Sequence, residues 1–127
     1  MHRRIQRGHV AQARGLGAED AACAALIRDG WAVLARRLRS TAGEIDIVAE
    51  RDGLLAIVEV KARPTLADAA AALTDRQKAR LLDAADIVLA DHPEWGALGV
   101  RFDILVVDAL GKVRRIADAF RREHPSD

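Results

Sequence analysis

GEIDIVAERDGLLAIVEVKAR, residues 43–63, consists of two apolar runs on either side of Asp52-Gly53. An Asp-Gly pair between apolar runs is a strong signal for a β-hairpin with a two-residue turn. The sequence therefore predicts two antiparallel strands that meet at this pair. Charged residues interrupt the two runs at four positions where a core strand normally carries Val, Ile or Leu: Glu44, Asp46, Glu59 and Lys61.

The length of the turn fixes which residues of the two strands face each other. With a two-residue turn, Asp46 lies opposite Glu59, and Glu44 lies opposite Lys61. Because side chains alternate along a strand, all four point to one face of the hairpin. The other face is predicted to be an apolar core surface formed by Ile45, Ile47, Ala49, Ala56, Val58 and Val60. A three-residue loop would shift this register.

The opposed carboxylates of Asp46 and Glu59 have a physical cost. Acidic residues directly opposite each other, with Cβ atoms about 5 Å apart, repel and destabilise a strand pair. A solvated edge, on which Lys61 offsets the repulsion, explains Glu44 well but explains the facing acids poorly. Apolar residues share the charged face and indicate burial nearby: Val48, Leu55 and Ile57. Partly buried like charges need a cation or a raised pKa.

Oxygen ligands without His or Cys favour a hard divalent cation, Mg²⁺ or Mn²⁺. A lysine beside such an ion can orient a water molecule and stabilise developing negative charge. The pattern Asp46, Glu59 and Lys61 therefore predicts metal-assisted hydrolysis of a phosphodiester.

Further elements are predicted on both sides of the hairpin: a helix over residues 18–29 and strands over 31–39, 100–108 and, shorter, 112–116. Thr74 and Gln77 form a T-x-x-Q capping box, which predicts a helix that ends before Pro93. TLADAAAAL, residues 65–73, fits either a short helix or an irregular connection. The order α-β-β-β-α-β, with an added last strand, predicts an α/β fold in which helices flank a mixed sheet.

Composition is that of a globular protein, and 127 residues predict a single domain. We expect residues 1–14 to form a basic arm and residues from about 117 to form a tail with one helical turn. Four aromatic residues and no Tyr argue against a module that stacks single-stranded bases. Cys23 is the sole cysteine, which excludes an intramolecular disulfide and a multi-cysteine zinc site.

No segment approaches the about 18 apolar residues of a membrane span. The basic N-terminus is not followed by the apolar stretch of a secretory signal. We therefore expect a cytoplasmic protein without a membrane partner.

Basic residues are unevenly distributed on a chain whose net charge is only +1. Residues 1–18 contain Arg3, Arg4, Arg7 and Arg14 and no acidic residue. Further clusters are Arg36, Arg37 and Arg39, then Arg114 and Arg115, then Arg121 and Arg122. Local basic patches fit a phosphate backbone as partner, and Arg suits bidentate phosphate contacts. Solvated surface charge is the alternative interpretation.

Asp46, followed thirteen residues later by Glu59-Val60-Lys61, resembles the signature of the PD-(D/E)xK nuclease superfamily. The ordered motifs GxxAE, GEIDIVA, VEVKAR and RFDIL resemble the YraN family of predicted endonucleases, which is related to archaeal Holliday-junction resolvases. The resemblance covers about residues 12–108 and implies a restriction-endonuclease-like, three-layer core. The proline that precedes the motif aspartate in the superfamily is absent, and Ile45 stands there instead.

The resemblance also implies roles for single residues. Asp46 and Glu59 would bind Mg²⁺ or Mn²⁺ together with the Val60 carbonyl, and Lys61 would act on the attacking water or the developing charge. Glu19 would reach the site from its helix, unless it is only a first-turn carboxylate favoured by the helix dipole. Auxiliary candidates are Glu44, which alternatively pairs with Lys61, and Gln77, which alternatively only caps its helix. Candidate nucleic-acid contacts are Arg36, Arg37, Arg39, Arg63 and Lys78.

The function predicted from the sequence is a metal-dependent endonuclease that acts on DNA rather than RNA, with branched or structured DNA as a candidate substrate. Cleavage of a junction would require a homodimer that presents two sites. The alternative from another class is a nucleic-acid-binding or assembly protein that uses the nuclease fold with little or no cleavage. A hydrolase of another phosphorylated ligand is disfavoured, since the arginines do not gather around one phosphate loop.

Overall fold

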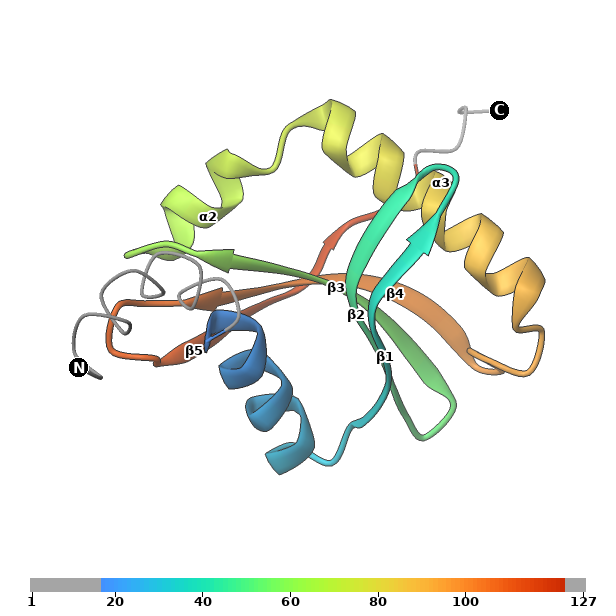
Figure 1. The fold of residues 1–127 in the computed structure, drawn as a ribbon, viewed down its shortest axis with the longest axis horizontal. Coiled ribbons are helices and arrows are strands. Elements are labelled where there is room, and N and C mark those ends of the chain that lie inside the picture. The colour runs from blue at the N-terminus through green and yellow to red at the C-terminus, as the bar shows by residue number, and fades with distance from the viewer. Residues whose placement is uncertain (1–16, 123–127) are drawn as a thin grey trace, which may run out of the picture.

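A mixed β-sheet lies between a helix on one face and two helices on the other in the computed structural model, which describes residues 17–122 (Figure 1). The first helix covers residues 17–28 of the described part. It is followed by β1 (Ala32–Ser40), β2 (Gly43–Arg51), β3 (Leu54–Ala62), α2 (Leu66–Ala72), α3 (Asp75–Asp91), β4 (Gly99–Val107) and β5 (Val113–Phe120). The predicted α/β architecture is confirmed. The predicted basic arm, residues 1–14, lies outside the described residues.

The five strands lie side by side in chain order, β1-β2-β3-β4-β5. Only β3 and β4 are parallel, and the other neighbours are antiparallel. A parallel pair needs a long crossover, and the segment that contains α2 and α3 supplies it. The ambiguous segment before α3 does fold as a helix, because Thr65 caps α2 by accepting a hydrogen bond from the Asp68 N–H.

The turn between β2 and β3 has the predicted two residues, Asp52 and Gly53. Their φ angles are +51° and +82°, as a tight turn that matches the twist of the strands requires. The pairing that follows runs from Arg51 opposite Leu54 to Ile47 opposite Val58, so the predicted register is confirmed over five pairs.

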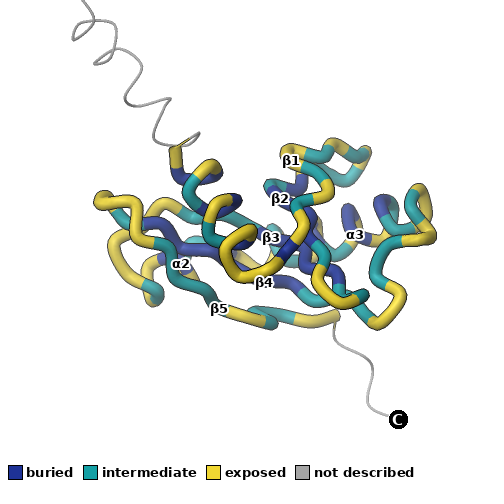
Figure 2. The backbone as a smooth tube through the Cα atoms, turned by 90° about the horizontal axis from the view of Figure 1, so that it is seen from below, coloured by how far each residue is buried: buried dark blue, intermediate teal, exposed yellow. Residues whose placement is uncertain are grey.

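Both faces of the sheet are buried (Figure 2). The first helix packs on one face, over a cluster that includes Ile47, Ala49, Ala56, Val58 and Trp31. The helices α2 and α3 pack on the other, over a cluster that includes Ile45, Val48, Leu55 and Ile57. Each residue of the second list is at most 1% exposed.

The prediction that Ile45 shares a face of the sheet with Ile47 is wrong. The two side chains belong to clusters on opposite faces of the sheet, although two residues apart in a regular strand point the same way. The alternation of β2 therefore changes at Asp46, between them. This change of face cannot be read from an apolar pattern, because both isoleucines are fully buried.

The helix α3 begins at the predicted capping box. The Thr74 hydroxyl accepts a hydrogen bond from the Gln77 N–H, and the Gln77 side chain accepts one from the Thr74 N–H. The helix ends at Asp91, two residues before Pro93. Leu81, Ala84, Ala85 and Val88 are its buried residues, so the predicted apolar stripe faces the sheet.

The end of the described chain differs from the prediction of a tail with one helical turn. The strand β5 continues to Phe120, after a register shift opposite Asp103. Asp118 lies in this irregular part with φ +52°, and its N–H donates a 2.9 Å hydrogen bond to the Asp103 carboxylate. The bulge depends on a residue of another strand, and so local sequence does not reveal it. None of the helices within residues 17–122 has the length and apolarity needed to cross a membrane.

Candidate functional site

The carboxylate of Asp46 lies at the point where β2 and β3 stop pairing. The last backbone pair is Ile47 with Val58, although both strands continue beyond it. There the Asp46 Oδ2 atom accepts a 2.8 Å hydrogen bond from the Val60 N–H. The side chain thus occupies a position that a backbone carbonyl would otherwise take in an antiparallel ladder, and its orientation is fixed by the main chain of β3.

Glu59 lies beside Asp46, so the structure brings the two predicted metal-binding acids together. The carboxyl groups are within hydrogen-bonding reach of each other. Burial, and then the charge of Asp46, raise the pKa of Glu59 to about 7. Burial also raises the pKa of Asp46, against the opposing effect of the Val60 N–H. Two adjacent acids that cannot easily both ionise hold a proton between them near neutral pH.

Lys61 is the cation next to this pair. Its Nζ atom lies 3.6 Å from Glu59 Oε1, and both side chains are 15% exposed. The two residues are two positions apart on β3, so they point to the same side of the strand. The charge of Lys61 lowers the pKa of Glu59, but the effects of burial and of Asp46 are larger.

Glu44 does not form the predicted pair with Lys61. Its carboxylate lies 3.6 Å from Arg39 Nε, which is opposite it on β1. The reason is topological: Glu44 is in the part of β2 that pairs with β1 and no longer with β3. Both side chains of this ion pair are well exposed, so Arg39 keeps most of its surface for another partner.

Glu19 comes from the first helix and is 7% exposed. It lies close enough to Asp46 for its charge to raise the pKa of that carboxyl. Each of its oxygens is bound: Oε1 accepts from Arg36 Nε at 3.0 Å, and Oε2 accepts from Arg37 Nε at 3.1 Å. The Nη2 atom of Arg36 also donates to Asp20 at 2.6 Å. Glu19 is therefore near the carboxylate pair but held by two arginines.

Adjacent strand residues normally point to opposite faces, yet Arg36 and Arg37 both reach Glu19. Arg37 has φ +52°, a backbone conformation that non-glycine residues adopt at a cost of about 1 kcal/mol. This departure from a regular strand accounts for the shared target of the two guanidinium groups. Their side chains remain 40% and 50% exposed, so a second partner can still reach them.

The other candidate contacts lie at the surface. Arg63 follows β3, and its guanidinium group donates to the carbonyl of the preceding residue, Ala62. Lys78 lies 3.9 Å from Asp75 in the first turn of α3. The side-chain amide oxygen Oε1 of Gln77 accepts the hydrogen bond of the capping box from the Thr74 N–H. Helix capping is the simpler of the two roles predicted for Gln77.

Asp46 and Glu59 are the side chains that fit a divalent cation. They offer carboxylate oxygens only, and a cation would relieve the repulsion that now retains a proton between them. Within residues 17–122, no three or more His, Cys, Asp and Glu side chains are grouped closely enough to hold a metal ion. Two carboxylates with water and phosphate oxygens are, however, the usual ligand set of Mg²⁺ in phosphoryl-transfer sites.

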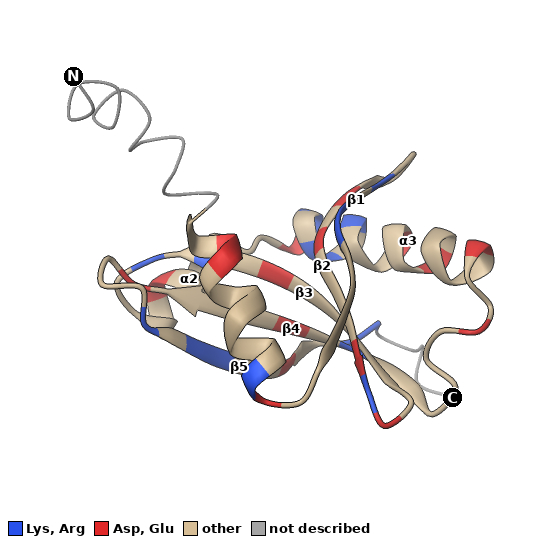
Figure 3. Ribbon diagram, turned by 60° about the horizontal axis from the view of Figure 1, so that its bottom comes forward, with Lys and Arg blue, Asp and Glu red and all other residues tan. Residues whose placement is uncertain are grey.

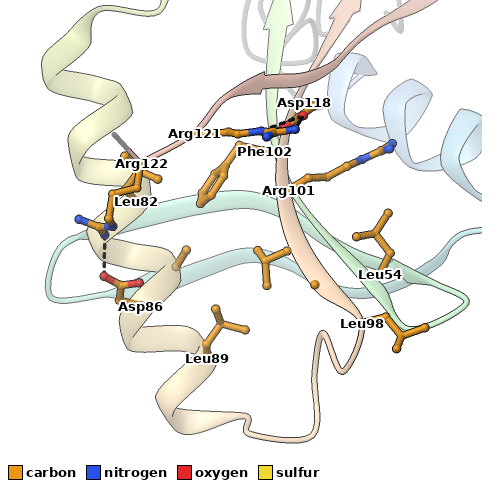
Figure 4. Close-up of a pocket in the computed structure, with 13 residues that line it drawn as sticks. Leu54, Leu82, Asp86, Leu89, Leu98, Arg101, Phe102, Asp118, Arg121 and Arg122 are labelled. Atoms are coloured by element: carbon orange, nitrogen blue, oxygen red, sulfur yellow. Dashed lines mark hydrogen bonds and ion pairs between the residues drawn. The ribbon is translucent and has the colours of Figure 1, made fainter. Parts of the chain in front are cut away.

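The cavity of about 630 Å³ between α3 and β4 is at another place (Figure 4). Leu54, Leu82, Leu89, Leu98 and Phe102 are among its apolar lining residues. Arginines at its rim are neutralised, since Arg121 pairs with Asp118 and Arg122 pairs with Asp86. None of the predicted site residues lines this cavity.

A charged cluster that the sequence reasoning missed surrounds Asp103, whose side chain is 0% exposed. Arg101 Nη2 donates to Asp103 Oδ2 at 2.9 Å, and Arg115 Nε lies 3.7 Å from the same oxygen. RFDILVVD, residues 101–108, contains a signal for this cluster, because it places an acid within an apolar strand, as the sequence also does at Asp46.

Comparison with known proteins adds a family match. Residues 18–107 match the family described as Uncharacterised protein family UPF0102. A UPF0102 protein of Granulibacter bethesdensis is 62% identical over 119 residues, which are 94% of this chain and 75% of that protein. A UPF0102 protein of Azorhizobium caulinodans is 48% identical over 93% of this chain and 90% of its own length. One of Rhodopseudomonas palustris is 49% identical over 84% of this chain and 82% of its own length. These names state no activity.

Proposed function

Since the chain belongs to the uncharacterised protein family UPF0102, the YraN family predicted from its motifs, we propose that the protein is a metal-dependent endonuclease acting on DNA. The family name carries no reaction. The proposal therefore rests on the site, and above all on one observation: two partly buried carboxyl groups, Asp46 and Glu59, lie side by side next to Lys61.

Asp46 and Glu59 would hold the cation, with the Val60 carbonyl as the third protein ligand that the family resemblance implies. When bound, Mg²⁺ or Mn²⁺ supplies Lewis-acid polarisation of a phosphoryl oxygen and lowers the pKa of a bound water. Asp46 needs no reorganisation for this role, because the Val60 N–H already fixes its carboxylate. Glu59 has to give up its proton, which its pKa of about 7 permits at neutral pH.

Lys61 has two tasks in this mechanism. Its ammonium group lies beside Glu59 and offers positive charge to the phosphate oxygens as negative charge develops on them. Burial removes water that would stabilise the ionised form of Glu59, and the positive charge of Lys61 replaces part of that stabilisation. Lys61 thereby lowers the pKa of Glu59. Because Lys61 is 15% exposed, water competes little for its charge.

Arg39 and Arg63 are the candidate contacts with the DNA backbone. Both are exposed, and both lie at the end of the strands that carries the carboxylate pair. Contacts of this kind neutralise phosphates without reading sequence, and they make affinity dependent on salt.

A second candidate function is a nucleic-acid-binding or assembly protein with little or no cleavage. The binding of both Glu19 oxygens by Arg36 and Arg37 favours it, because a third carboxylate is then not available to a metal. The carboxylate pair argues for the first function, since a binding module has no use for two partly buried acids that repel.

The test is cleavage of a labelled panel with Mg²⁺ or Mn²⁺: linear duplex, single strand, flap, four-way junction and RNA. We expect cleavage of one of the DNA substrates by the unmodified chain and its loss in Lys61→Ala. Lys112→Ala, at an exposed turn, is the matched control and should cleave normally. A folded protein that cleaves no member of the panel, but binds one, would favour the second function.

A further inference from the structure

Trp31 is the centre of an arginine cluster under the first helix. Three guanidinium carbons lie over its ring, at 4.7 Å for Arg51, 5.2 Å for Arg101 and 5.4 Å for Arg115, measured to the ring centroid. One such contact occurs in about 75 residues of an average protein, so three on one ring are a concentration of positive charge. The ring itself is 3% exposed.

The three arginines come from three strands of one sheet face. Arg51 ends β2, Arg101 lies on β4, and Arg115 lies on β5. In Figure 4 the end of the Arg101 side chain extends toward the first helix. Figure 3 shows the basic run of β5 on the same side of the molecule as that helix. The cluster is thus assembled by the sheet, from residues up to 64 apart in sequence.

The cluster is not neutral. Asp103 is the carboxylate that contacts it, and it is shared by Arg101 and Arg115. Arg51 donates to a backbone carbonyl, that of Asp29, and has no ion pair within residues 17–122. An arginine cannot release its proton, so three guanidinium groups and one carboxylate leave two positive charges. Like charges this close favour the binding of an anion.

Donors in the cluster also lack acceptors. The Trp31 indole N–H and the Arg101 Nε–H are buried and have no hydrogen-bond partner in the described part of the chain. They are not open to a ligand, but they leave uncompensated positive ends of dipoles in the interior, which add to the field of the guanidinium groups. Access is provided from outside, because Arg101 and Arg115 are 22% and 23% exposed and Arg51 is exposed.

We propose that Arg51, Arg101 and Arg115, stacked on Trp31, form a binding site for a phosphate group. Planar guanidinium groups suit the tetrahedral oxygens of phosphate, and stacking on the indole ring holds them in place before the ligand arrives. The site is separate from Asp46 and Glu59. Trp31 follows Glu19 by twelve residues, and the nine residues that follow Glu19 to the end of the first helix at Arg28 span about 14 Å along the helix axis.

The phosphate group has two sources that the chemistry does not distinguish: a phosphate monoester or inorganic phosphate, and the backbone of a nucleic acid. In the second case the cluster would hold the nucleic-acid backbone at a place separate from the carboxylate pair. Binding of inorganic phosphate requires no cleavage, so this proposal and the proposed nuclease can fail independently.

The experiment uses the fluorescence of Trp31 in the full chain carrying Trp95→Phe, which removes the other tryptophan. Inorganic phosphate is titrated at constant ionic strength, with chloride as the reference anion. We expect a saturable change in emission with phosphate and none with chloride. Arg51→Gln should weaken the apparent affinity about fivefold, because it removes one of the three charges without touching Asp103.

Arg115→Gln should have a larger effect, about tenfold, and Arg114→Gln is its matched control. Arg114 is the neighbouring residue on β5 and donates to Pro64 near α2, on the opposite face of the sheet. Arg115→Gln could unfold the chain by leaving Asp103 with fewer partners, and in that case Arg51→Gln decides. No saturable response to phosphate, or equal affinities of the Arg51→Gln and Arg114→Gln chains, would overturn the proposal.

A short DNA duplex identifies the source. If the duplex displaces phosphate from Trp31, and Arg51→Gln lowers the slope of log affinity against log salt by about one, the site takes a backbone phosphate. If phosphate binds but the duplex leaves the Trp31 signal unchanged, the site takes a small phosphate compound. Either result supports the phosphate site.

Discussion

The backbone N–H of Val60 donates a 2.8 Å hydrogen bond to the carboxylate of Asp46, directly beyond the last backbone pair of β2 and β3. The bond fixes one acid against the main chain of the strand that carries the other acid, Glu59. Separation of the two strands makes room for the side chains, while burial keeps water from screening their repulsion. The arrangement is unfavourable for the chain alone, and the proposed cation would make it favourable.

Asp46→Asn tests this balance. The amide oxygen can still accept from the Val60 N–H, while the charge that repels Glu59 is removed. Without divalent cations we expect an unchanged or higher melting temperature. With Mn²⁺ or Mg²⁺ at about 100 times its dissociation constant, the unmodified chain should gain about 2.7 kcal/mol of stability, and Asp46→Asn should gain almost none. Asp52→Asn, in the exposed turn of the same hairpin, is the control and should respond like the unmodified chain. Unfolding of Asp46→Asn would mean that the acid has a structural role.

The pKa of Glu59 predicts how stability depends on pH in the absence of metal. Burial and the charge of Asp46 raise this pKa from 4.5 to about 7. Between these values the folded chain binds more protons at this residue than the unfolded chain does. The contribution of Glu59 to the free energy of unfolding therefore falls as pH rises from about 4.5 to about 7, by on the order of 2 kcal/mol.

The measurement is urea denaturation at pH 5 and pH 7.5 for the unmodified chain and for Glu59→Gln. Carboxylates other than Asp46 contribute to both chains alike, so the difference between the two pH dependences isolates the pair of Glu59 and Asp46. Glu94→Gln, which changes an exposed acid, is the control. Equal pH dependences of Glu59→Gln and the unmodified chain would contradict the raised pKa.

Asp103→Asn should destabilise the fold more than either change in the candidate site. The new amide oxygen can still accept the hydrogen bond from the Asp118 N–H. The substitution removes, however, the only carboxylate that Arg101 and Arg115 contact within the described residues. We expect a loss of about 2–3 kcal/mol, below the full cost of breaking a buried ion pair because both arginines are partly exposed. Denaturant unfolding measures it, with Asp75→Asn at a fully exposed position as the control. A loss under 0.5 kcal/mol would show that the buried charge is dispensable.

Local chemistry explains which elements could be predicted. The Asp52-Gly53 turn and the box of Thr74 and Gln77 are encoded within two to four residues, and both were confirmed. Counting along the two strands from the turn predicted that Asp46 lies beside Glu59, and the register used for this holds as far as Ile47 opposite Val58.

What could not be predicted depends on residues far apart in the chain. Glu44 binds Arg39 because β2 changes its partner from β3 to β1 along its length. Arg37 reaches Glu19 because its backbone is left-handed, which no propensity of arginine indicates. The strand β5 extends to Phe120 around a bulge that Asp103 stabilises from β4. Each of these features depends on contacts between residues far apart in the chain, which the local sequence pattern does not predict.

Arg39→Gln with Arg63→Gln tests the proposed contact with nucleic acid. Both side chains are exposed, so the change should leave the melting temperature within about 1 °C. If each arginine neutralises one phosphate, the slope of log affinity for duplex DNA against log salt should decrease by about two. Fluorescence anisotropy with a labelled duplex at 50 to 200 mM salt measures it. Arg76→Gln, at the exposed start of α3, gives a control of equal charge change per residue, and an equal effect there would indicate nonspecific attraction.

Glu19→Gln tests whether Glu19 takes part in catalysis or only restrains Arg36 and Arg37. The amide keeps one acceptor but loses the charge that holds Arg36 and Arg37, both of which then become available to phosphates. We expect a loss of about 1–2 kcal/mol in stability, because the carboxylate is buried and the arginines are half exposed. Affinity for duplex DNA should rise, with a steeper salt dependence.

The rate at which the Glu19→Gln chain cleaves DNA then decides whether Glu19 has a catalytic role. If Glu19 takes part in catalysis, cleavage falls at least 100-fold although binding is stronger, which a purely structural role cannot produce. If Glu19 only restrains the arginines, the cleavage rate is unchanged or increases together with the affinity for DNA. Asp20→Asn is the matched control, since it removes an exposed acid that also binds Arg36 but leaves Glu19 intact. Weaker DNA binding by Glu19→Gln would contradict the view that Glu19 competes with phosphate for the two arginines.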